Sequence, residues 1–381
     1  MIKNMKRILR ATTIAETFDL IKGLLAELSK HYDVQLLSSP GPKLDELSEK
    51  YGMKANAVEM FRRITPTKDI KSLYQLVRVF RREKPDMVHS MTPKAGLLCM
   101  LAAWWTKVPI RVHTFTGLVW PTETGLKRRL LMLTDKITCA CATHVIPEGD
   151  GVKHDMQNYH ITRKPMRVLG HGNIRGVDME RFSRRQEVLD MAEPIRDEER
   201  FTFVFVGRIV RDKGINELCE AFERIHSRHP EARLILVGPF EDELDPVSEA
   251  ARNTIEHFPD VISVGRVFDD DVLIYYAAAD CFVFPSYREG FPNTVLEAGA
   301  MGLPSIVTDI NGSREIIVEG ENGTIIPSKD ADALYDAMER MMTDREWRSK
   351  MAEKARQMIM DRFEQGYVQR CQLEFYEEIM K

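Results

Sequence analysis

The hydrophobic positions of this chain follow two alternating patterns. Short apolar runs predict buried strands, and stretches with apolar residues three or four positions apart predict helices. Alternation of strand and helix is typical of a parallel, doubly wound α/β sheet. In the first half, strands are predicted at 5–10, 34–37, 87–89 and 110–113, with helices at 17–31, 70–82 and 94–105.

The alternation restarts after a break in the pattern. Residues 170–178 are glycine-rich and 183–200 are polar, so we expect them to join two domains. A length of 381 residues also favours two cores over one. We predict a first domain over 1–175, completed by a terminal helix at about 362–381 that crosses back, and a second domain over 176–361. Strands of the second domain are expected within 201–208, 233–239, 261–264, 280–285, 304–309 and 323–327.

Composition and the chain's start point to a cytoplasmic protein. Hydrophobic residues make up 44% and charged residues 29%, as in ordinary globular domains. The N-terminal residues are interrupted by charge and do not resemble a signal peptide. The apolar runs, such as 97–105, are far shorter than the roughly 20 residues that span a bilayer. The six cysteines have no CxxC spacing, so we expect reduced residues in the core.

Charge is divided unevenly along the chain, whose net charge is −4. Residues 1–180 hold 29 of the 54 Lys and Arg but 18 of the 58 Asp and Glu, which leaves 25 against 40 in the rest. The basic half favours an anionic partner. No recognisable nucleic-acid-binding module accompanies the charge, so nucleic acid is not expected.

An anionic membrane surface is the partner that the basic half favours, although solvated helix faces are the simpler alternative. The cations concerned are Arg62, Arg63, Arg78, Arg81, Arg82, Lys84, Lys127, Arg128 and Arg129. Apolar residues near them would allow shallow insertion. The candidates for insertion are Met60, Phe61, Ile64, Leu118, Val119 and Trp120.

A loop and helix start at 284–298 is the strongest candidate site. Glu289 lies in the predicted loop and Glu297 in the helix after it, with a Gly-Phe-Pro turn between them. The start of a helix attracts anions, and carboxylates accept hydrogen bonds from sugar diols. A nucleotide sugar carries both an anionic diphosphate and sugar diols.

A second loop, 207–214, follows the strand predicted within 201–208, a run apolar enough to be buried. It carries Arg208 and Lys213, a guanidinium fork and a point charge that suit a diphosphate, although a surface loop is the simpler alternative. Backbone groups of 265–267 could bond a base edge. The acidic run 269–271 could hold a metal ion, but its place before a helix favours capping, so no metal is expected.

Three loops of the first domain follow predicted strands, at 11–17, 90–96 and 113–124. The first contains no glycine, which argues against a dinucleotide site of the NAD type. His113 could face a reacting sugar or be a buried histidine bonded to backbone, and His89 is interpreted as buried. Lys94 could meet an acceptor phosphate or cap its loop.

These motifs together resemble the retaining glycosyltransferases of family 4, and the resemblance covers nearly the whole chain. Glu289 to Glu297 matches the family's E-x7-E pattern, 206–214 its diphosphate loop and 176–182 its interdomain segment. Segments 88–98 and 115–118 resemble members that build capsule and O-antigen. The resemblance implies the GT-B fold, an α/β fold in which two Rossmann-like domains face a central cleft.

The resemblance also implies roles for individual residues. Arg208 and Lys213 would bind the diphosphate, Glu297 the ribose diol and Glu289 the donor sugar, while His113 is the match for a histidine that contacts the donor sugar. The donor would be a UDP-sugar in preference to other nucleotides, with no metal and no cofactor. Other donor contacts would come from Gly207, Arg266, Val267, Gly290, Phe291, Pro292, Asn293 and Thr294, and acceptor contacts from Thr13, Lys94, Thr116 and Gly117.

The expected reaction is transfer to a polyprenyl-diphosphate-linked saccharide by an enzyme that is peripheral at the inner face of the cell membrane. Two alternatives to this function remain. The first is a different enzyme on the same fold, either a nucleotide-sugar epimerase or a glycogen-type polymerase. The second alternative comes from a different class of protein, a non-catalytic nucleotide-binding or scaffold protein. An epimerase would act on the donor without an acceptor, and a scaffold would bind the donor without turnover.

Overall fold

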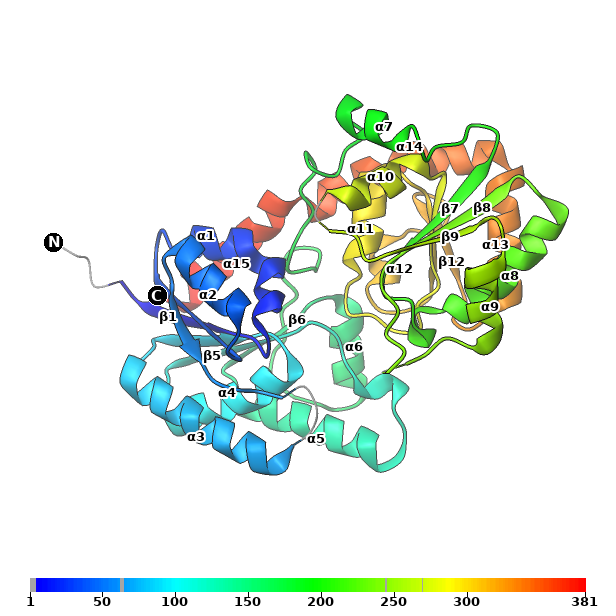
Figure 1. The fold of residues 1–381 in the computed structure, drawn as a ribbon. Helices are drawn as coiled ribbons and strands as arrows, with labels where there is room; N and C mark the ends of the chain where they lie inside the picture. The colour runs from blue at the N-terminus through cyan, green and yellow to red at the C-terminus, as the bar shows by residue number, and fades with distance from the viewer. Residues whose placement is uncertain (1–4, 62–64, 244, 269) are drawn as a thin grey trace. The chain divides into compact units, whose positions relative to one another are not determined.

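The computed structural model describes residues 5–61, 65–243, 245–268 and 270–381. They form two compact units (Figure 1). The first unit consists of the residues up to Gly176 together with Gly366–Lys381, and the second of Val177–Gln365. Each unit has a six-stranded parallel sheet with helices around it, which confirms the two doubly wound α/β domains predicted from the hydrophobic pattern.

The sheet of the first unit has the strand order β3-β2-β1-β4-β5-β6, and all neighbouring strands are parallel. Its strands are β1 (Arg7–Ala11), β2 (Asp33–Ser38), β3 (Lys54–Ala57), β4 (Met87–Ser90), β5 (Ile110–Phe115) and β6 (His144–Pro147). The helices are η1 (Ala15–Ile21), α1 (Lys22–Leu28), α2 (Pro42–Tyr51), α3 (Pro66–Glu83), α4 (Pro93–Trp105), η2 (Trp120–Thr122), α5 (Gly125–Cys141), α6 (Asp150–Asn158) and the C-terminal α15 (Gln365–Ile379).

Two hydrophobic clusters cover the two faces of this sheet. One packs α3, α4 and the end of α5 against the strands, and the other packs α1 and η1 together with Phe375, Tyr376 and Met380 from the C-terminal end. The last helix of the chain therefore completes the first unit, which confirms the predicted crossing back. It is fastened there by the buried Arg10 guanidinium, which donates to the Tyr376 hydroxyl.

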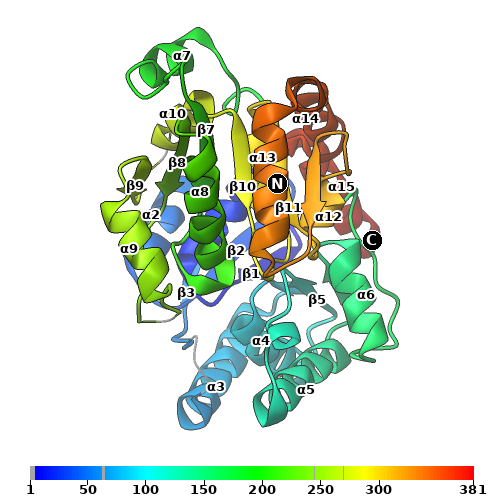
Figure 2. The ribbon, with the colours of Figure 1, turned by 90° about the vertical axis from the view of Figure 1, so that its right-hand side faces the viewer.

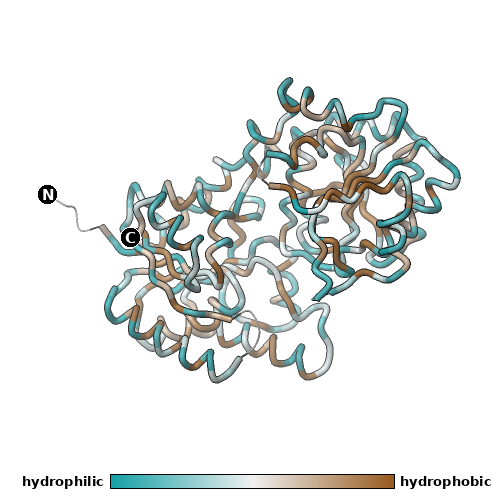
Figure 3. The backbone as a smooth tube through the Cα atoms, in the orientation of Figure 1, coloured by the Kyte–Doolittle hydropathy of each residue, from teal (hydrophilic) through white to brown (hydrophobic). Residues whose placement is uncertain are grey.

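The sheet of the second unit has the strand order β12-β11-β10-β7-β8-β9 (Figure 2). Its strands are hydrophobic, as the brown segments of this unit in Figure 3 show, and they lie in a single core cluster with the surrounding helices. The strands are β7 (Phe201–Val206), β8 (Ala232–Val237), β9 (Val261–Gly265), β10 (Cys281–Phe284), β11 (Ser305–Thr308) and β12 (Gly323–Ile326). The helices are α7 (Gln186–Ala192), η3 (Arg211–Lys213), α8 (Ile215–Arg228), α9 (Glu249–His257), α10 (Asp271–Ala278), α11 (Asn293–Ala300), α12 (Ser313–Ile316), α13 (Ala331–Thr343) and α14 (Arg345–Phe363).

Both sheets have a point at which the direction of strand addition reverses. It lies between β1 and β4 in the first unit and between β7 and β10 in the second. Ligands of doubly wound sheets bind at the carboxyl ends of the strands beside this point, because the two loops there diverge and leave a crevice. The loops after β7 and β10 are the two in which the sequence places its strongest motifs.

Candidate active site

The loops after β7 and β10 are packed directly against each other. The Tyr287 amide donates to the Asp212 carbonyl at 2.9 Å. Gly214 has φ +72°, and a Cβ atom there would lie 2.1 Å from the Pro285 carbonyl oxygen. Glycine is therefore required at this position, both for its backbone conformation and for the close approach of the two loops.

Lys213 and Glu289, predicted from separate motifs, form an ion pair between these loops. Their side chains are only 13% and 17% exposed, so the pair is largely shielded from water. Ser286 Oγ donates to Glu289 Oε1 at 3.0 Å, and Lys213 Nζ lies 5.3 Å from the centre of the Phe284 ring. The charges of the two side chains compensate each other at the end of the sheet.

Arg208 lies on the same loop and forms a second ion pair. Its Nη1 is 2.7 Å from Glu241 Oε2, and the Arg208 side chain is 44% exposed. Burial lowers the pKa of Arg208, but the hydrogen bond and charge of Glu241 outweigh it and raise the pKa overall. Glu241 is a functional candidate that the sequence did not reveal. Its place shortly after β8 was the signal that could have found it.

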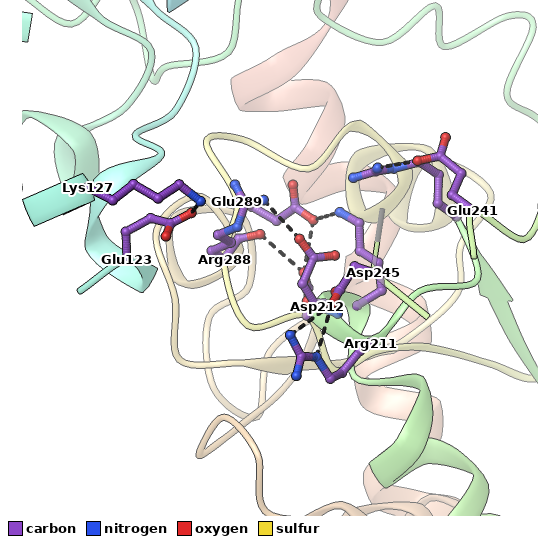
Figure 4. A network of polar contacts seen from close by, with 11 residues as sticks. Glu123, Lys127, Arg211, Asp212, Glu241, Asp245, Arg288 and Glu289 are labelled. Carbon is purple, nitrogen blue, oxygen red and sulfur yellow. Dashed lines mark hydrogen bonds and ion pairs between the residues drawn. The ribbon is translucent and has the colours of Figure 1, made fainter. Parts of the chain in front are cut away.

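A network of charged residues holds the Arg208–Lys213 loop in shape (Figure 4). Arg288 Nη2 donates to Asp212 Oδ2 at 2.9 Å, and the Asp212 amide donates to Asp245 Oδ2 at 2.7 Å. Arg211 pairs with Asp245 at 2.9 Å. The carboxylates of this network therefore bind neighbouring parts of the loop and fix the backbone that carries Lys213.

Glu297 lies on α11, in the first turns after the Gly-Phe-Pro turn, and is 8% exposed. The Tyr276 hydroxyl, from α10, donates to Glu297 Oε2 at 3.2 Å. Tyr276 is fully buried and thereby fixes the carboxylate from behind. The sequence did not indicate this role for Tyr276, because a tyrosine at an apolar position of a helix has the pattern of a core residue.

The turn before α11 lies close to Gly312. A Cβ atom at Gly312 would be 2.5 Å from the Gly290 carbonyl oxygen and 2.7 Å from Pro292 Cδ. Phe291 is buried, with its ring 5.4 Å from that of Phe363. Asn293 and Thr294 form the first turn of α11. The sequence-predicted donor residues 290–294 are thus held at the start of a helix beside Lys213 and Glu289.

The remaining candidates of the second unit lie at other strand ends. Gly207 follows β7, and its amide donates to Val237. Arg266 and Val267 follow β9, where Arg266 is exposed and Val267 packs against the core.

The acidic run lies at the start of α10 as predicted, with Asp271 in the first turn, but the predicted capping hydrogen bond needs a correction. Residue 269 lies outside the described residues, and Asp270 is the N-cap of α10 but its side chain makes no cap hydrogen bond. Instead Asp270 Oδ1 accepts from Arg181 Nε at 2.7 Å, because the guanidinium is within reach and competes for the carboxylate. Across the described parts of the chain, no group of three or more His, Cys, Asp or Glu is placed to hold a metal ion.

His113 lies within β5 and is 2% exposed. Its Nδ1 is 2.8 Å from Ser90 Oγ, and Gly96 lies so close that a Cβ there would be 2.3 Å from His113 Cε1. Burial lowers the pKa of His113 to about 3, so the imidazole is neutral. Ser90 fixes the imidazole through its hydroxyl and also through a backbone hydrogen bond, which agrees with the buried, backbone-bonded histidine that was one of the two alternatives.

His89 is buried as well, and its ring nitrogens are hydrogen-bonded to Arg10, Tyr376 and Thr114. Burial, followed by the charge of Arg10, holds the pKa of His89 well below its ordinary value. A buried, hydrogen-bonded histidine is what the sequence predicted at this position.

The acceptor-side candidates divide between two places in the first unit. Thr13 Oγ1 is 2.7 Å from Thr92 Oγ1, so the loops after β1 and β4 meet at the reversal of strand order. Lys94 Nζ is 2.6 Å from Asp69 Oδ2, with side chains 10% and 17% exposed. Lys94 thus ties α4 to α3, which is neither of its two predicted uses, and its contact with an acceptor phosphate stays a prediction.

Thr116 and Gly117 line a small hollow beside His113. Phe115, Trp120 and Asp135 also line it. The Trp120 indole donates from Nε1 to Asp135 Oδ2 at 3.0 Å, which places one carboxyl group and one neutral imidazole in the same hollow.

Asp135 makes the stability of the protein depend on pH. Burial raises its pKa to about 7, although the hydrogen bond from Trp120 lowers it. An aspartate of the unfolded chain titrates near 4. The folded protein therefore keeps a proton that the unfolded chain releases between about pH 4 and 7, and stability falls as pH rises through this window.

Asp135→Asn removes this titration and keeps an oxygen that accepts from Trp120. We expect the variant to be more stable than the wild type at pH 8 by about 1–3 kcal/mol, with a smaller difference at pH 5. Urea unfolding at both pH values measures it. Asp45→Asn, an exposed change in the same unit, is the control, and an equal difference for Asp135→Asn at both pH values would contradict the prediction.

The prediction that six apolar residues of the first domain insert into a membrane is wrong for three of them. Met60, Leu118 and Trp120 are buried in the core of the first unit. Trp120 is held there by Asp135 and by the Tyr159 ring at 4.8 Å, because its large apolar surface gains more from the core than from an exposed loop. Phe61 and Val119 are half-buried. Arg62, Arg63 and Ile64 lie outside the described residues.

The two parallel sheets, each with a reversal of strand order, define a two-domain α/β protein of the GT-B class. Solved structures show the same fold: Anabaena HepE in complex with UDP has a TM-score of 0.80 at 15% identity, over 98% of this chain and 100% of that one. Sucrose-phosphate synthase from Thermosynechococcus elongatus has a TM-score of 0.79 at 18% identity, over 98% and 99%.

Sequence comparisons give the family. Residues 19–180 match the model for Glycosyltransferase Family 4, and 189–358 match that for Glycosyl transferases group 1. The capsular polysaccharide biosynthesis glycosyltransferase CapM of Staphylococcus aureus is 32% identical over 95% of this chain and 94% of its own length. A UDP-Gal:alpha-D-GlcNAc-diphosphoundecaprenol alpha-1,3-galactosyltransferase of Escherichia coli is 30% identical over 83% and 82%. The chain belongs to glycosyltransferase family 4.

Proposed function

We propose that this enzyme transfers a hexosyl or N-acetylhexosaminyl group from a UDP-sugar to a polyprenyl-diphosphate-linked sugar, with retention of the anomeric configuration. The reaction would serve the biosynthesis of a bacterial surface polysaccharide. The names of its relatives support this, since one is a capsule enzyme and another uses UDP-galactose and a diphosphoundecaprenol-linked acceptor.

The observation that carries the proposal is the meeting of Lys213 and Glu289 where the strand order reverses. Two cations, Arg208 and Lys213, lie at the end of β7, and two carboxylates, Glu289 and Glu297, lie beyond β10. A nucleotide sugar carries a diphosphate for the cations and two sets of hydroxyls for the carboxylates. Each half of the site thus has a matching half of the ligand.

In the proposed reaction the bond between the anomeric carbon and the diphosphate oxygen breaks, and the electron pair leaves with the UDP. Negative charge grows on the diphosphate, so Arg208 and Lys213 stabilise the transition state more than the ground state. The acceptor hydroxyl attacks from the face that the diphosphate leaves and gives its proton to the departing phosphate oxygen. The products are the extended lipid-linked saccharide and UDP.

The Lys213–Glu289 pair prepares both residues for this step. When the diphosphate binds, its oxygens compete with Glu289 for the ammonium group, and the carboxylate becomes available to the hydroxyls of the donor sugar. Glu289 therefore acts in positioning and electrostatics. The two cations supply the positive charge that a divalent metal would otherwise bring, so the proposed mechanism has no metal step.

The test is transfer to a defined acceptor. The purified enzyme is incubated with UDP- and GDP-sugars and a synthetic polyprenyl-diphosphate-linked N-acetylhexosamine, with and without EDTA. We expect a glycosylated lipid from one of the UDP-sugars, equal rates with EDTA, and retained configuration by NMR. Conversion of the donor without acceptor would instead indicate an epimerase, and binding without turnover would indicate a non-catalytic protein.

A further inference from the structure

The helices α3, α4 and α5 form one layer on the sheet of the first unit, side by side in both Figure 1 and Figure 2. Their outer surface exposes large apolar side chains. On α5, Leu126, Leu130 and Leu133 are 82%, 40% and 52% exposed. Their spacing of four and three residues places them on one face of the helix, and we call them the α5 apolar stripe. The neighbouring helices expose Ile70, Tyr74, Trp104 and Trp105.

The same three helices have a strongly one-sided charge. The structure describes all residues of these helices, and together they contain ten Lys and Arg but only three carboxylates. Each of the three carboxylates already has a partner inside the protein: Asp69 binds Lys94, Glu83 is buried beside Lys54 and Arg82, and Asp135 accepts from Trp120. Lys94 and Arg82 are taken up by these pairs, so the outer surface of the layer combines apolar side chains with the positive charge of the other cations.

We infer that the α3–α5 layer is the surface by which this protein docks on an anionic lipid membrane, with the α5 apolar stripe inserted among the headgroups. Cations attract an anionic leaflet, and exposed leucines and tryptophans gain by entering the boundary of the hydrocarbon. Arg129 and Lys136 lie between and beyond the leucines on α5 and would contact lipid phosphates at the same depth.

A second copy of the chain is the other occupant to consider. A symmetric pair formed through this layer would bring the same cations of both copies together, with the carboxylates of the three helices already bound elsewhere. Repulsion between like charges therefore disfavours self-association and favours a negatively charged partner. Among the described residues, no helix is long and apolar enough to cross a bilayer, so surface docking is the mode of contact considered.

The inference deepens the proposed function, which supplies a lipid-linked acceptor, but its evidence is independent of that function. The test is co-sedimentation with phosphatidylcholine vesicles that contain or lack phosphatidylglycerol, without any sugar. We expect binding to the anionic vesicles that weakens with salt, and a loss of about tenfold or more for Leu126→Ser/Leu130→Ser/Leu133→Ser. Arg129→Glu/Lys136→Glu should lose binding to a similar degree.

Matched controls lie in the second unit. Met191→Ser/Phe268→Ser removes exposed apolar groups there, and Lys350→Glu reverses an exposed charge, so both should bind as the wild type does. Equal binding by the stripe variants, or equal binding to neutral vesicles, would overturn the inference. A concentration-dependent dimer that the stripe substitutions abolish would overturn it too, and assign the layer to a second copy.

Activity separates this inference from the proposed function. With a short-chain acceptor in solution the stripe variants should turn over at the wild-type rate, whereas with the acceptor in anionic vesicles they should be slower. Vesicle binding that depends on the stripe, with no transfer to any acceptor, would leave the docking surface standing and remove the proposed reaction.

Discussion

Replacing Lys213 with alanine is expected to lower turnover of the nucleotide sugar by about 10²-fold or more. Its ammonium group lies at the end of the loop that follows β7, beside Glu289 and over Phe284, and the side chain is only 13% exposed. A cation in so dry a site interacts strongly with charge that develops on a leaving diphosphate. Steady-state kinetics with the donor found in the transfer assay measures the loss.

The ion pair complicates this experiment, because removing Lys213 also leaves the Glu289 carboxylate shielded and unbalanced. A double-mutant cycle separates the two effects. If Lys213 acts on the diphosphate, Lys213→Ala/Glu289→Gln will be far slower than Glu289→Gln alone. If Lys213 serves only to neutralise Glu289, the double variant will be as active as Glu289→Gln. Lys350→Ala, an exposed lysine change, is the control for folding and handling.

Arg208 allows a second test of how cations act on the charge that develops on the diphosphate. Its guanidinium is 44% exposed and paired with Glu241, so its removal leaves a carboxylate in contact with water and disturbs the fold less. A loss of turnover in Arg208→Ala that is similar to that in Lys213→Ala would support a shared action on the diphosphate. Wild-type turnover in both folded variants would contradict the mechanism.

The elements buried on both faces were predictable from the sequence, and so were the loops after them. Strand β7 is apolar except for Thr202 and its burial is nearly complete, and the hydrophobic pattern reveals such strands directly. The loops that carry Lys213 and Glu289 follow these strands at once, so placing the strands also placed the loops. Their meeting, however, follows from the order of strands in the sheet, which no local pattern contains.

Partners that come from a distance were not predictable in this way. Glu241 reaches Arg208 from the loop after β8, and Tyr276 reaches Glu297 from another helix, so neither has a motif of its own. The membrane residues failed for a related reason. Trp120 is of a residue type that often inserts into membranes, but it lies in the core. Helix α5, which exposes its leucines, was not among the predicted helices. A leucine pattern alone does not tell which face meets the protein.

Glu297→Ala is expected to weaken UDP binding by about 30-fold, which corresponds to the roughly 2 kcal/mol of a hydrogen bond to a charged group. Glu297 is 8% exposed and its carboxylate is anchored by Tyr276, so the carboxylate is preorganised to accept from the two hydroxyls of a ribose. Isothermal titration calorimetry with UDP, which has no donor sugar, measures this contact without contributions from Glu289.

Two further variants show whether the effect comes from the carboxylate or from disturbed packing. Glu297→Gln keeps the volume and an oxygen for the Tyr276 hydroxyl but loses the charge, so we expect a loss between those of the wild type and Glu297→Ala. Tyr276→Phe removes only the hydroxyl that fixes the carboxylate, and about fivefold weaker binding is expected from a hydrogen bond of about 1 kcal/mol. Glu353→Ala, an exposed change on α14, should bind as the wild type does. Unchanged UDP affinity in folded Glu297→Ala would remove Glu297 from the nucleotide site and leave the assignment of the ribose to another residue.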